Sequence, residues 1–183
     1  MNDEELIVLV DSGGNPIGTA KKLASHHDST PLHLGFSCFL FNRRGELLIT
    51  QRAASKKVWP GVWTNSVCGH PGPNESMEAA IRRRLDYELG MEAADLACVL
   101  PDYRYKTPLF RGIVENEICP VYLGRTDDEP RPNQEEVAGY RWISWKDFLS
   151  SIKNNPERYS YWSIEEARLL SRNPLIEDYT TAL

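Results

Sequence analysis

Short apolar runs, separated by turns rich in glycine, proline, asparagine and aspartate, recur along the chain and predict strands. The run LIVLV at residues 6–10 predicts a strand, and DSGGNP directly after it predicts a turn. Apolar segments at 34–41 and 46–51, joined by NRRG, predict a hairpin. Further strands are expected at 64–67 within a long structured loop over 55–74, at 97–100, at 113–123, and at 139–143 after an exposed connection over 125–136.

Helical patterns are fewer. The clearest covers residues 75–89, with Asn74 as the expected N-cap and Gly90 as the stop. Residues 144–152 and 163–171 predict two more helices, the second with a Ser163–Glu166 capping box, and a short helix is expected within 21–31. Because strands and helices do not alternate as βαβ units, we expect an α+β fold with a mixed sheet between helices.

Length and composition narrow the class of protein. The chain has 183 residues, 41% hydrophobic and 26% charged, which is typical of one globular domain with a sizeable core. A net charge of −5 argues against general nucleic-acid binding. The longest apolar runs fall far short of the roughly 20 residues that span a bilayer. The N-terminus lacks the basic and apolar stretches of a secretory signal. We therefore expect a cytoplasmic protein with four reduced cysteines, which show no CxxC spacing.

Two charged residues fall on the apolar side of the predicted 75–89 helix. With Met77 at zero and 100° per residue, Ile81 lies at about 40°, Arg84 at about 340° and Glu88 at about 20°. Buried charges are rare unless they are paired. Either Arg84 and Glu88 form an i,i+4 ion pair at a frayed edge of the core, or this helix face lines a cavity where Glu88 meets a metal and Arg84 an anion.

Acidic and histidine residues form a second unusual set. Glu115 and Glu117 are two apart in a predicted strand, so both side chains point to one face, about 7 Å apart. On a solvated edge strand this has no consequence, whereas in a buried strand the two carboxylates need a cation between them. The histidines lie at positions 26, 27, 33 and 70 and have no zinc-finger spacing, so they are either ordinary hydrogen-bonding residues or part of a site for Mn²⁺, Mg²⁺ or Zn²⁺.

One cysteine differs from the other three. Cys38, Cys98 and Cys119 lie in apolar, strand-like surroundings, where cysteine is usually a small buried hydrophobic residue. Cys68 lies beside Gly69 and His70 at the entrance of a loop. That position suits a partly exposed thiol that can be activated.

The segment 69–91 resembles the Nudix box, G-x5-E-x7-R-E-U-x-E-E-x-G-U. It keeps both glycines, Glu75, Arg83 and Glu88, but has Arg84 and Tyr87 where the box has glutamates. In Nudix hydrolases those acids help to hold the metals that activate water. Their loss argues against diphosphate hydrolysis, which is nevertheless the alternative function.

Over residues 5–165 the chain resembles type 1 isopentenyl diphosphate isomerases. The segments that carry the resemblance are HHDSTPLHL at 26–34, SKKVWPGVWTNSVCGHP at 55–71, YRY at 103–105 and GIVENE at 112–117. The resemblance implies a Nudix-type α/β/α sandwich, with a core at about 31–165 and extensions at 1–30 and 166–183 packed on it as one domain. It also implies that a double bond moves between isopentenyl and dimethylallyl diphosphate.

The resemblance further implies a role for each candidate residue. One divalent metal, with Mn²⁺ favoured over Zn²⁺ or Mg²⁺, would be bound by His26, His33, His70, Glu115 and Glu117. A second, Mg²⁺, would bind the diphosphate together with Glu88 and the Cys68 carbonyl. The basic residues at the diphosphate would be Lys22, Arg52, Lys56 and Arg84.

In the implied mechanism an alkene is protonated to a tertiary carbocation and a neighbouring carbon then loses a proton. Glu117, polarised by the metal and next to Tyr105, would serve the protonating side, and Cys68 would transfer the other proton on the opposite face, in a chamber without water. The division of acid and base between them depends on the direction of the reaction. The face of Trp162 would stabilise the cation. Trp162 could instead, or also, act as a hydrophobic staple before Ser163. A non-catalytic binding module would leave Cys68 and Glu117 without a joint purpose. We expect a small diphosphate substrate, no nucleic-acid or membrane partner, and a monomer or homodimer.

Overall fold

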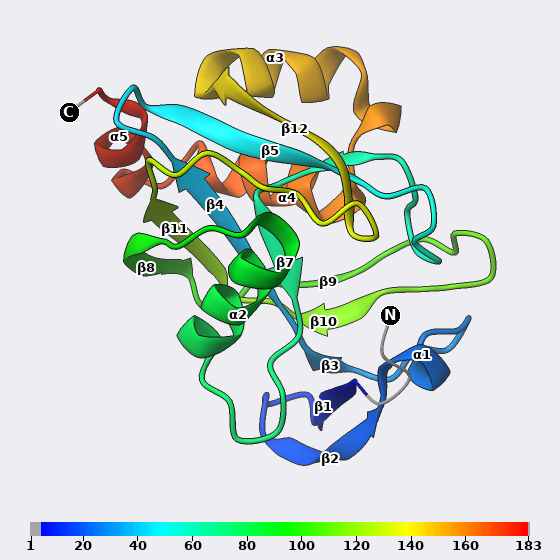
Figure 1. Cartoon of the computed structure of the whole chain (residues 1–183). Helices are drawn as coiled ribbons and strands as arrows, with labels where there is room; N and C mark the ends of the chain where they lie inside the picture. Colours follow the sequence, from blue (N-terminus) through cyan, green and yellow to red (C-terminus); the bar gives the residue numbers. More distant parts are fainter. Residues whose placement is uncertain (1–4, 183) are drawn as a thin grey trace.

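The computed structural model describes residues 5–182. The part of the N-terminal prediction that concerns residues 1–4, and the C-terminal residue 183, lie outside the described residues. Two β-sheets and five α-helices form the fold (Figure 1). Among the described residues no helix has the length and apolar character needed to cross a membrane.

The smaller sheet has five strands in the order β2-β1-β3-β10-β9. Its strands are β1 (Leu6–Val10), β2 (Pro16–Lys21), β3 (His33–Leu34), β9 (Arg104–Lys106) and β10 (Asn116–Ile118). Strands β3 and β10 run parallel, and the other neighbours are antiparallel. The short helix α1 (Lys22–Ser25) follows β2.

The larger sheet has the order β12-β5-β4-β11-β8. Its strands are β4 (Phe36–Phe41), β5 (Glu46–Arg52), β8 (Ala94–Leu100), β11 (Val121–Arg125) and β12 (Val137–Ser144), with β6 (Trp63–Thr64) paired to β5 and β7 (Val67–Gly69) paired to β4. Strands β4 and β11 are parallel and the remaining pairs are antiparallel, so the sheet is mixed.

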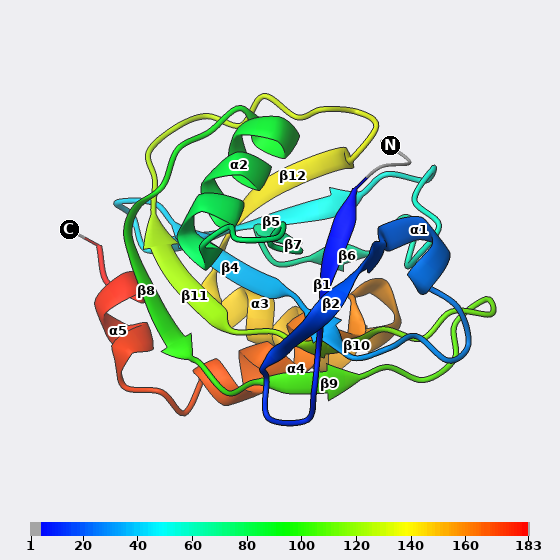
Figure 2. The same cartoon turned by 90° about the horizontal axis from the view of Figure 1, so that it is seen from below.

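Helices cover both faces of the larger sheet, as the view from below shows (Figure 2). The helix α2 (Met77–Leu89) packs on one face, where its Ile81 and Leu85 contact the residues of β4 that point that way, such as Leu40. Helices α3 (Trp145–Asn154), α4 (Tyr161–Leu170) and α5 (Leu175–Thr180) cover the other face, with a 3₁₀ turn η1 (Pro156–Arg158) between α3 and α4. The alternation of β4 side chains between two apolar cores is the pattern of a strand buried on both faces.

Two chain segments cross from the smaller to the larger sheet side by side. One passes from β3 to β4 at Gly35, and the other from β10 to β11 at Cys119 and Pro120. The Gly35 N–H donates to the Ile118 carbonyl at 2.9 Å, and the Ser37 N–H to the Pro120 carbonyl at 3.1 Å. This crossing sets the angle between the two sheets and opens the space where the candidate residues gather.

The predicted α+β class, the mixed sheet between helices and the hairpin with its turn at 42–45 are confirmed. The single strand predicted at 113–123 is wrong, because it divides into β10 and β11 in different sheets. Pro120 has no N–H to continue a ladder, so a central strand cannot run through it. The strand predicted at 64–67 is likewise two strands, β6 and β7.

Two helix starts also differ from the prediction. Helix α2 is capped by Ser76, whose hydroxyl accepts from the Ala79 N–H at 3.2 Å, whereas Asn74 has a left-handed φ of 62° in the preceding turn. Helix α4 begins at Tyr161, two residues earlier than predicted, and its N-cap is Ser160 rather than Ser163. The Ser163–Glu166 capping box is therefore wrong.

Candidate active site

Glu117 lies in the middle strand of three that present a common face. On the smaller sheet it is opposite His33 of β3 on one side and Tyr105 of β9 on the other. Side chains of residues directly opposite one another on paired strands point to the same face. His33, Glu117 and Tyr105 therefore project together, and all three are buried.

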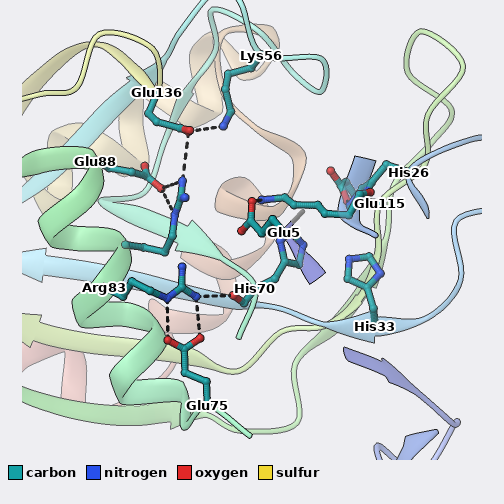
Figure 3. A network of polar contacts seen from close by, with 12 residues as sticks. Glu5, His26, His33, Lys56, His70, Glu75, Arg83, Glu88, Glu115 and Glu136 are labelled. Carbon is teal, nitrogen blue, oxygen red and sulfur yellow. Dashed lines mark hydrogen bonds and ion pairs between the residues drawn. The ribbon is translucent and has the colours of Figure 1, made fainter. Parts of the chain in front are cut away.

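Three histidines meet beside this row although they come from distant parts of the chain (Figure 3). His26 follows α1, His33 is in β3 and His70 follows β7, and their ring centroids are 4.9 to 5.5 Å apart. His26 Nε2 lies 3.1 Å from Glu115 Oε2, and His70 Nε2 lies 3.2 Å from Glu117 Oε1. The exposed His27 is not part of the group. The expected set of three histidines and two glutamates is thus assembled.

The hydrogen bonds of two histidines fit a metal site. The Nδ1 of His26 lies 2.6 Å from the Lys22 carbonyl oxygen, and the Nδ1 of His33 lies 2.9 Å from the Pro31 carbonyl oxygen. A carbonyl can only accept, so each Nδ1 carries the proton and donates it, which leaves the Nε2 lone pair free. The Nε2 of His33 is buried without a hydrogen bond among the described residues. Metal-binding histidines usually have this arrangement, so the residues present fit one divalent cation.

The electrostatics favour the protonation states that a cation needs at His70 and Glu117. At His26, burial would lower the pKa, but the Glu115 carboxylate outweighs burial and raises it. Burial lowers the pKa of His70 to about 4, so its imidazole is neutral. Burial alone would raise the pKa of Glu117, but the neighbouring imidazoles of His33 and His70 outweigh it and hold that pKa well below the ordinary value. Neutral imidazole and ionised carboxylate are the forms that bind a metal.

Cys68 reaches the same space from the other sheet. It lies in β7, opposite Ser37 of β4, and its side chain lines one cavity together with Glu117. Burial raises the pKa of Cys68 to about 12, although the nearby Arg52 acts in the opposite direction. The residue is half-buried, as expected, but the free protein carries a neutral thiol rather than an activated one.

Aromatic residues form the wall beside these two groups. The Tyr105 and Trp162 rings lie 6.2 Å apart, and the Trp162 indole N–H donates to Asn65 Oδ1 at 3.2 Å. The Arg52 guanidinium lies over the Trp162 ring, 5.5 Å from its centroid. Because α4 begins at Tyr161, Trp162 is inside the helix, so its predicted staple position before the cap is wrong.

Basic residues also line this cavity. Lys22, Arg52, Lys56 and Arg84 are all in its wall, as predicted. The Arg52 side chain is held by the Val58 and Trp59 carbonyls, at 2.9 to 3.2 Å, and the Lys22 ammonium lies 3.1 Å from Glu5 Oε2. With Lys57, five Lys and Arg residues are among the described residues that line the cavity. Clustered positive charge of this kind attracts anionic ligands.

Carboxylates balance part of that positive charge. The Arg84 guanidinium donates to Glu88 Oε1 from Nε at 2.8 Å and from Nη2 at 2.5 Å, and to Glu136 Oε2 at 3.2 Å. Glu136 also contacts the Lys56 ammonium (Figure 3). The helical-wheel prediction that Arg84 and Glu88 are buried is confirmed, and their i,i+4 pair lines the cavity rather than a frayed edge.

Two further residues at the site, Glu136 and Asn65, were not predicted from the sequence. Glu136 was expected in an exposed connection, which is wrong, because it is only 7% exposed and lies against Lys56 and Arg84. Asn65 donates to the Cys38 and Val67 carbonyls at 3.1 and 2.8 Å and so fixes the acceptor for Trp162. Asn65 is in the segment WTNSVCGHP, and the run of small polar residues there could have indicated that its side chain takes part in the site.

The retained Glu75 and Arg83 of the Nudix-like segment have a structural contact of their own. Arg83 donates to both oxygens of Glu75 at 2.7 Å, and Glu75 Oε2 accepts from the Gly72 N–H at 2.7 Å (Figure 3). Arg83 also donates to the His70 carbonyl at 3.2 Å. These bonds tie the 70–75 loop, and with it His70, to the side of α2.

Of the predicted residues, Lys22, His26, Arg52, Lys56, Cys68, His70, Arg84, Glu88, Tyr105, Glu115, Glu117 and Trp162 all line one cavity. His33 lies behind this wall and is fully buried, with its Nε2 3.6 Å from Glu117 Oε1. The thiol of Cys68 and the carboxylate of Glu117 thus line one cavity together with apolar, aromatic and basic residues.

A family model and the most similar relatives agree on the family of this chain. Residues 31–163 match the model of the NUDIX domain. The chain is 50% identical to an isopentenyl-diphosphate Delta-isomerase of Saccharopolyspora erythraea over 93% of this chain and 89% of that protein. It is 45% identical to one of Klebsiella pneumoniae over 98% and 97%.

Solved structures agree on the fold. The crystal structure of DR0079 from Deinococcus radiodurans is 24% identical, covers 90% of this chain and 98% of its own, and gives a TM-score of 0.71. The MutT protein of Methanosarcina mazei Go1 is 19% identical, with coverage of 78% and 94% and a TM-score of 0.61. The chain therefore belongs to the type 1 isopentenyl-diphosphate Delta-isomerase family of the Nudix superfamily.

Proposed function

We propose that the cavity between the two sheets is the site where isopentenyl diphosphate is converted to dimethylallyl diphosphate. The chain is an isopentenyl-diphosphate Delta-isomerase, an enzyme that moves a carbon–carbon double bond. The observation that carries the site assignment is that Cys68 and Glu117, from different sheets, line one cavity together with several basic residues.

The diphosphate is assigned to the basic residues of the cavity. Lys22, Arg52, Lys56 and Arg84 would bind its oxygens, and Glu88 with the Cys68 carbonyl would hold a magnesium ion on it. A carboxylate and a carbonyl are ligands that Mg²⁺ accepts together with substrate phosphate oxygens. Anchoring the diphosphate there orients the isoprenoid part toward Cys68, Tyr105 and Trp162.

The second metal is assigned to His26, His33, His70, Glu115 and Glu117. Their buried nitrogen and oxygen donors suit Mn²⁺ best, with Zn²⁺ and Mg²⁺ as alternatives. When bound, such an ion would supply positive charge beside Glu117, which would lower the proton affinity of that carboxylate. The carbonyls of Lys22 and Pro31 keep two of the imidazoles in the orientation needed.

The proton transfers are assigned to Cys68 and Glu117. An unactivated alkene takes a proton at its terminal carbon to give a tertiary carbocation, and the neighbouring carbon then loses a proton. The neutral Cys68 thiol has a proton to give, and the Glu117 carboxylate, beside Tyr105, can accept one. Which of them acts as acid depends on the direction of the reaction.

Trp162 is assigned to the carbocation. A desolvated cation over an indole face gains about 2 kcal/mol. The hydrogen bond of its N–H to Asn65 fixes the ring, and Tyr105 and Trp59 pack beside it. A wall of rings offers no nucleophile to the cation.

Diphosphate hydrolysis, the alternative function, has less support. Arg84 and Tyr87 occupy two acidic positions of the Nudix box, and Arg84 is paired to Glu88. The monomer or homodimer, the cytoplasmic location and the single domain over 1–183 stay predictions from the sequence.

The deciding experiment is incubation of the purified protein with isopentenyl diphosphate and Mg²⁺ in deuterated water. We expect deuterium in the allylic product and, through the reverse reaction, in recovered substrate. Conversion without any label from solvent would refute proton exchange at Cys68 and Glu117. Release of inorganic phosphate or pyrophosphate would favour the hydrolase.

A further inference from the structure

Glu136 is a buried carboxylate in the middle of the proposed diphosphate site. It lies directly before β12, and its backbone is fixed on both sides. Its N–H donates to the Asn133 carbonyl at 2.9 Å, and its own carbonyl accepts from the Ala53 N–H at 2.9 Å. A negative charge held rigidly in an anion site needs a reason, because it repels the ligand.

One oxygen of this carboxylate holds two cations. Glu136 Oε2 contacts the Lys56 ammonium and lies 3.2 Å from Arg84 Nη2. Burial alone would raise the pKa of Glu136, but the charges of Lys56 and Arg84 lower it below the ordinary value, so it is ionised. It therefore sets the separation of two like charges that would otherwise repel each other.

The cations keep donors for a ligand. Of the five N–H groups of Arg84, two bind Glu88 and one binds Glu136. Within residues 5–182 the two N–H groups on Nη1 make no hydrogen bond, and Lys56 uses one of its three donors on Glu136. Both side chains can thus bind Glu136 and an anion at once.

The two carboxylates around Arg84 are not equivalent. Glu88 makes two of the three hydrogen bonds to the guanidinium, yet it is also the residue assigned to magnesium. If its carboxylate turns to the ion, Arg84 loses those two bonds. Glu136, from another segment of the chain, is then the partner that remains.

We propose that Glu136 is a positioning residue that keeps Lys56 and Arg84 aimed at the diphosphate, above all when Glu88 is engaged with magnesium. The proposal rests on the assignment of the diphosphate and magnesium in the proposed function. It adds a division of work between two carboxylates: Glu88 exchanges partners on binding, and Glu136 does not.

The test is the binding of inorganic pyrophosphate by calorimetry, with and without Mg²⁺, to the full chain. Glu136→Gln keeps the size of the side chain and removes its charge. Glu135→Gln, the exposed neighbour in the same loop, is the matched control. We expect less than about a twofold weakening by Glu136→Gln without Mg²⁺, and about a tenfold weakening with it. The control should match the unsubstituted protein in both conditions.

Three other results would overturn the proposal. An equal loss with and without Mg²⁺ makes Glu136 an ordinary ion-pair partner of Arg84, and no loss makes it dispensable. An increased Mg²⁺ concentration for the half-maximal effect makes it a magnesium ligand instead. In isomerisation assays we expect KM to rise about tenfold with kcat within about threefold, since the proton-transfer groups are untouched.

Glu136→Asp keeps the charge at a shorter reach and provides a second variant if Glu136→Gln does not fold. With Mg²⁺, the pyrophosphate affinity of Glu136→Asp should lie between that of the native protein and that of Glu136→Gln. Without Mg²⁺, it should match that of the native protein. Because pyrophosphate binding needs no turnover, this test stands apart from the isomerase assay. Failure of the unsubstituted protein to isomerise would refute the proposed function and leave the binding result interpretable.

Discussion

Gly35 packs directly against the carboxylate of Glu117. A Cβ atom built on residue 35 would lie 2.0 Å from Glu117 Oε2 and 2.7 Å from its Cδ, which no real pair of atoms tolerates. Gly35 is also the point where one chain segment passes from the smaller to the larger sheet. The space that a side chain would need at this crossing is thus occupied by the proposed proton-transfer group.

Gly35→Ala should therefore displace the Glu117 carboxylate without unfolding the protein. A shift of about 1 Å in a reacting group can cost about 100-fold in rate, and we expect kcat to fall by that order. The matched control is Gly139→Ala in β12, where the nearest atom to a new Cβ is Gln51 Oε1 at 3.7 Å. Steady-state kinetics and circular dichroism check both variants, and unchanged kcat in Gly35→Ala would contradict the placement of Glu117.

Removing either proposed proton-transfer group should greatly lower turnover and leave the fold intact. General acid–base groups contribute about 10² to 10⁴ in rate, so Cys68→Ala and Glu117→Gln should each lower kcat by that range. Cys98→Ala, which changes an exposed thiol, is the control and should be near normal. Near-normal isomerisation by either Cys68→Ala or Glu117→Gln would show that the proton takes another route.

The histidine cluster should bind a metal that also stabilises the fold. A ligand that binds only the folded state raises its free energy of unfolding, so chelation should lower Tm and added Mn²⁺ should restore it. His33→Gln should remove most of this effect together with activity, because the buried His33 Nε2 then has no counterpart. The control is His27→Gln, which changes the exposed residue next to His26 and should keep both the metal-dependent Tm and the activity. A chelator-insensitive Tm and full activity after metal removal would contradict the site.

The sequence predicts features that depend on local residue spacing better than features that depend on contacts between distant parts of the chain. The burial of Arg84 and Glu88 follows from the helical wheel, because both residues belong to one regular element. The burial of Glu136 could not be predicted in this way, because its partners Lys56 and Arg84 are distant from it in sequence. Local polarity at 125–136 indicates exposure, and only the folded arrangement supplies the cations.

Strand partners show the same limit. The apolar pattern at 113–123 predicts extended chain, which is right, but it does not show that β10 and β11 join different sheets. Pro120 was the available signal for that break. The meeting of three histidines at 26, 33 and 70 came from the resemblance to a family, because no spacing rule brings α1, β3 and the end of β7 together.

Glu166 gives a prediction on stability that is independent of the reaction. It is fully buried in α4, and neither of its oxygens has a hydrogen bond among the described residues. Burial raises the pKa of its carboxyl to about 8 from an ordinary 4.5, against a smaller opposite effect of Ser37. At neutral pH the folded protein therefore holds a proton there that the unfolded chain has released.

The sign of the effect follows from that difference in bound protons. Below about pH 4.5 the carboxyl group is protonated in both states, so Glu166 makes no pH-dependent contribution to stability. Between about pH 4.5 and 8 each rise of one unit favours the unfolded state by about 1.4 kcal/mol, after which the effect levels off. Glu166→Gln has no proton to lose, so its advantage in free energy of unfolding should grow over this window to about 3 kcal/mol at pH 7.

Denaturant unfolding of both proteins at pH 5, 6, 7 and 8 measures this difference directly. Glu165→Gln, one residue earlier and only partly buried, is the control for loss of a carboxyl group on the same helix. A gap between Glu166→Gln and the native protein that stays constant from pH 5 to 8 would mean that Glu166 is already ionised in the folded state. That ionised form would need a cationic partner, and within residues 5–182 no Lys, Arg or His forms an ion pair with it. The neutral acid is the form compatible with its surroundings.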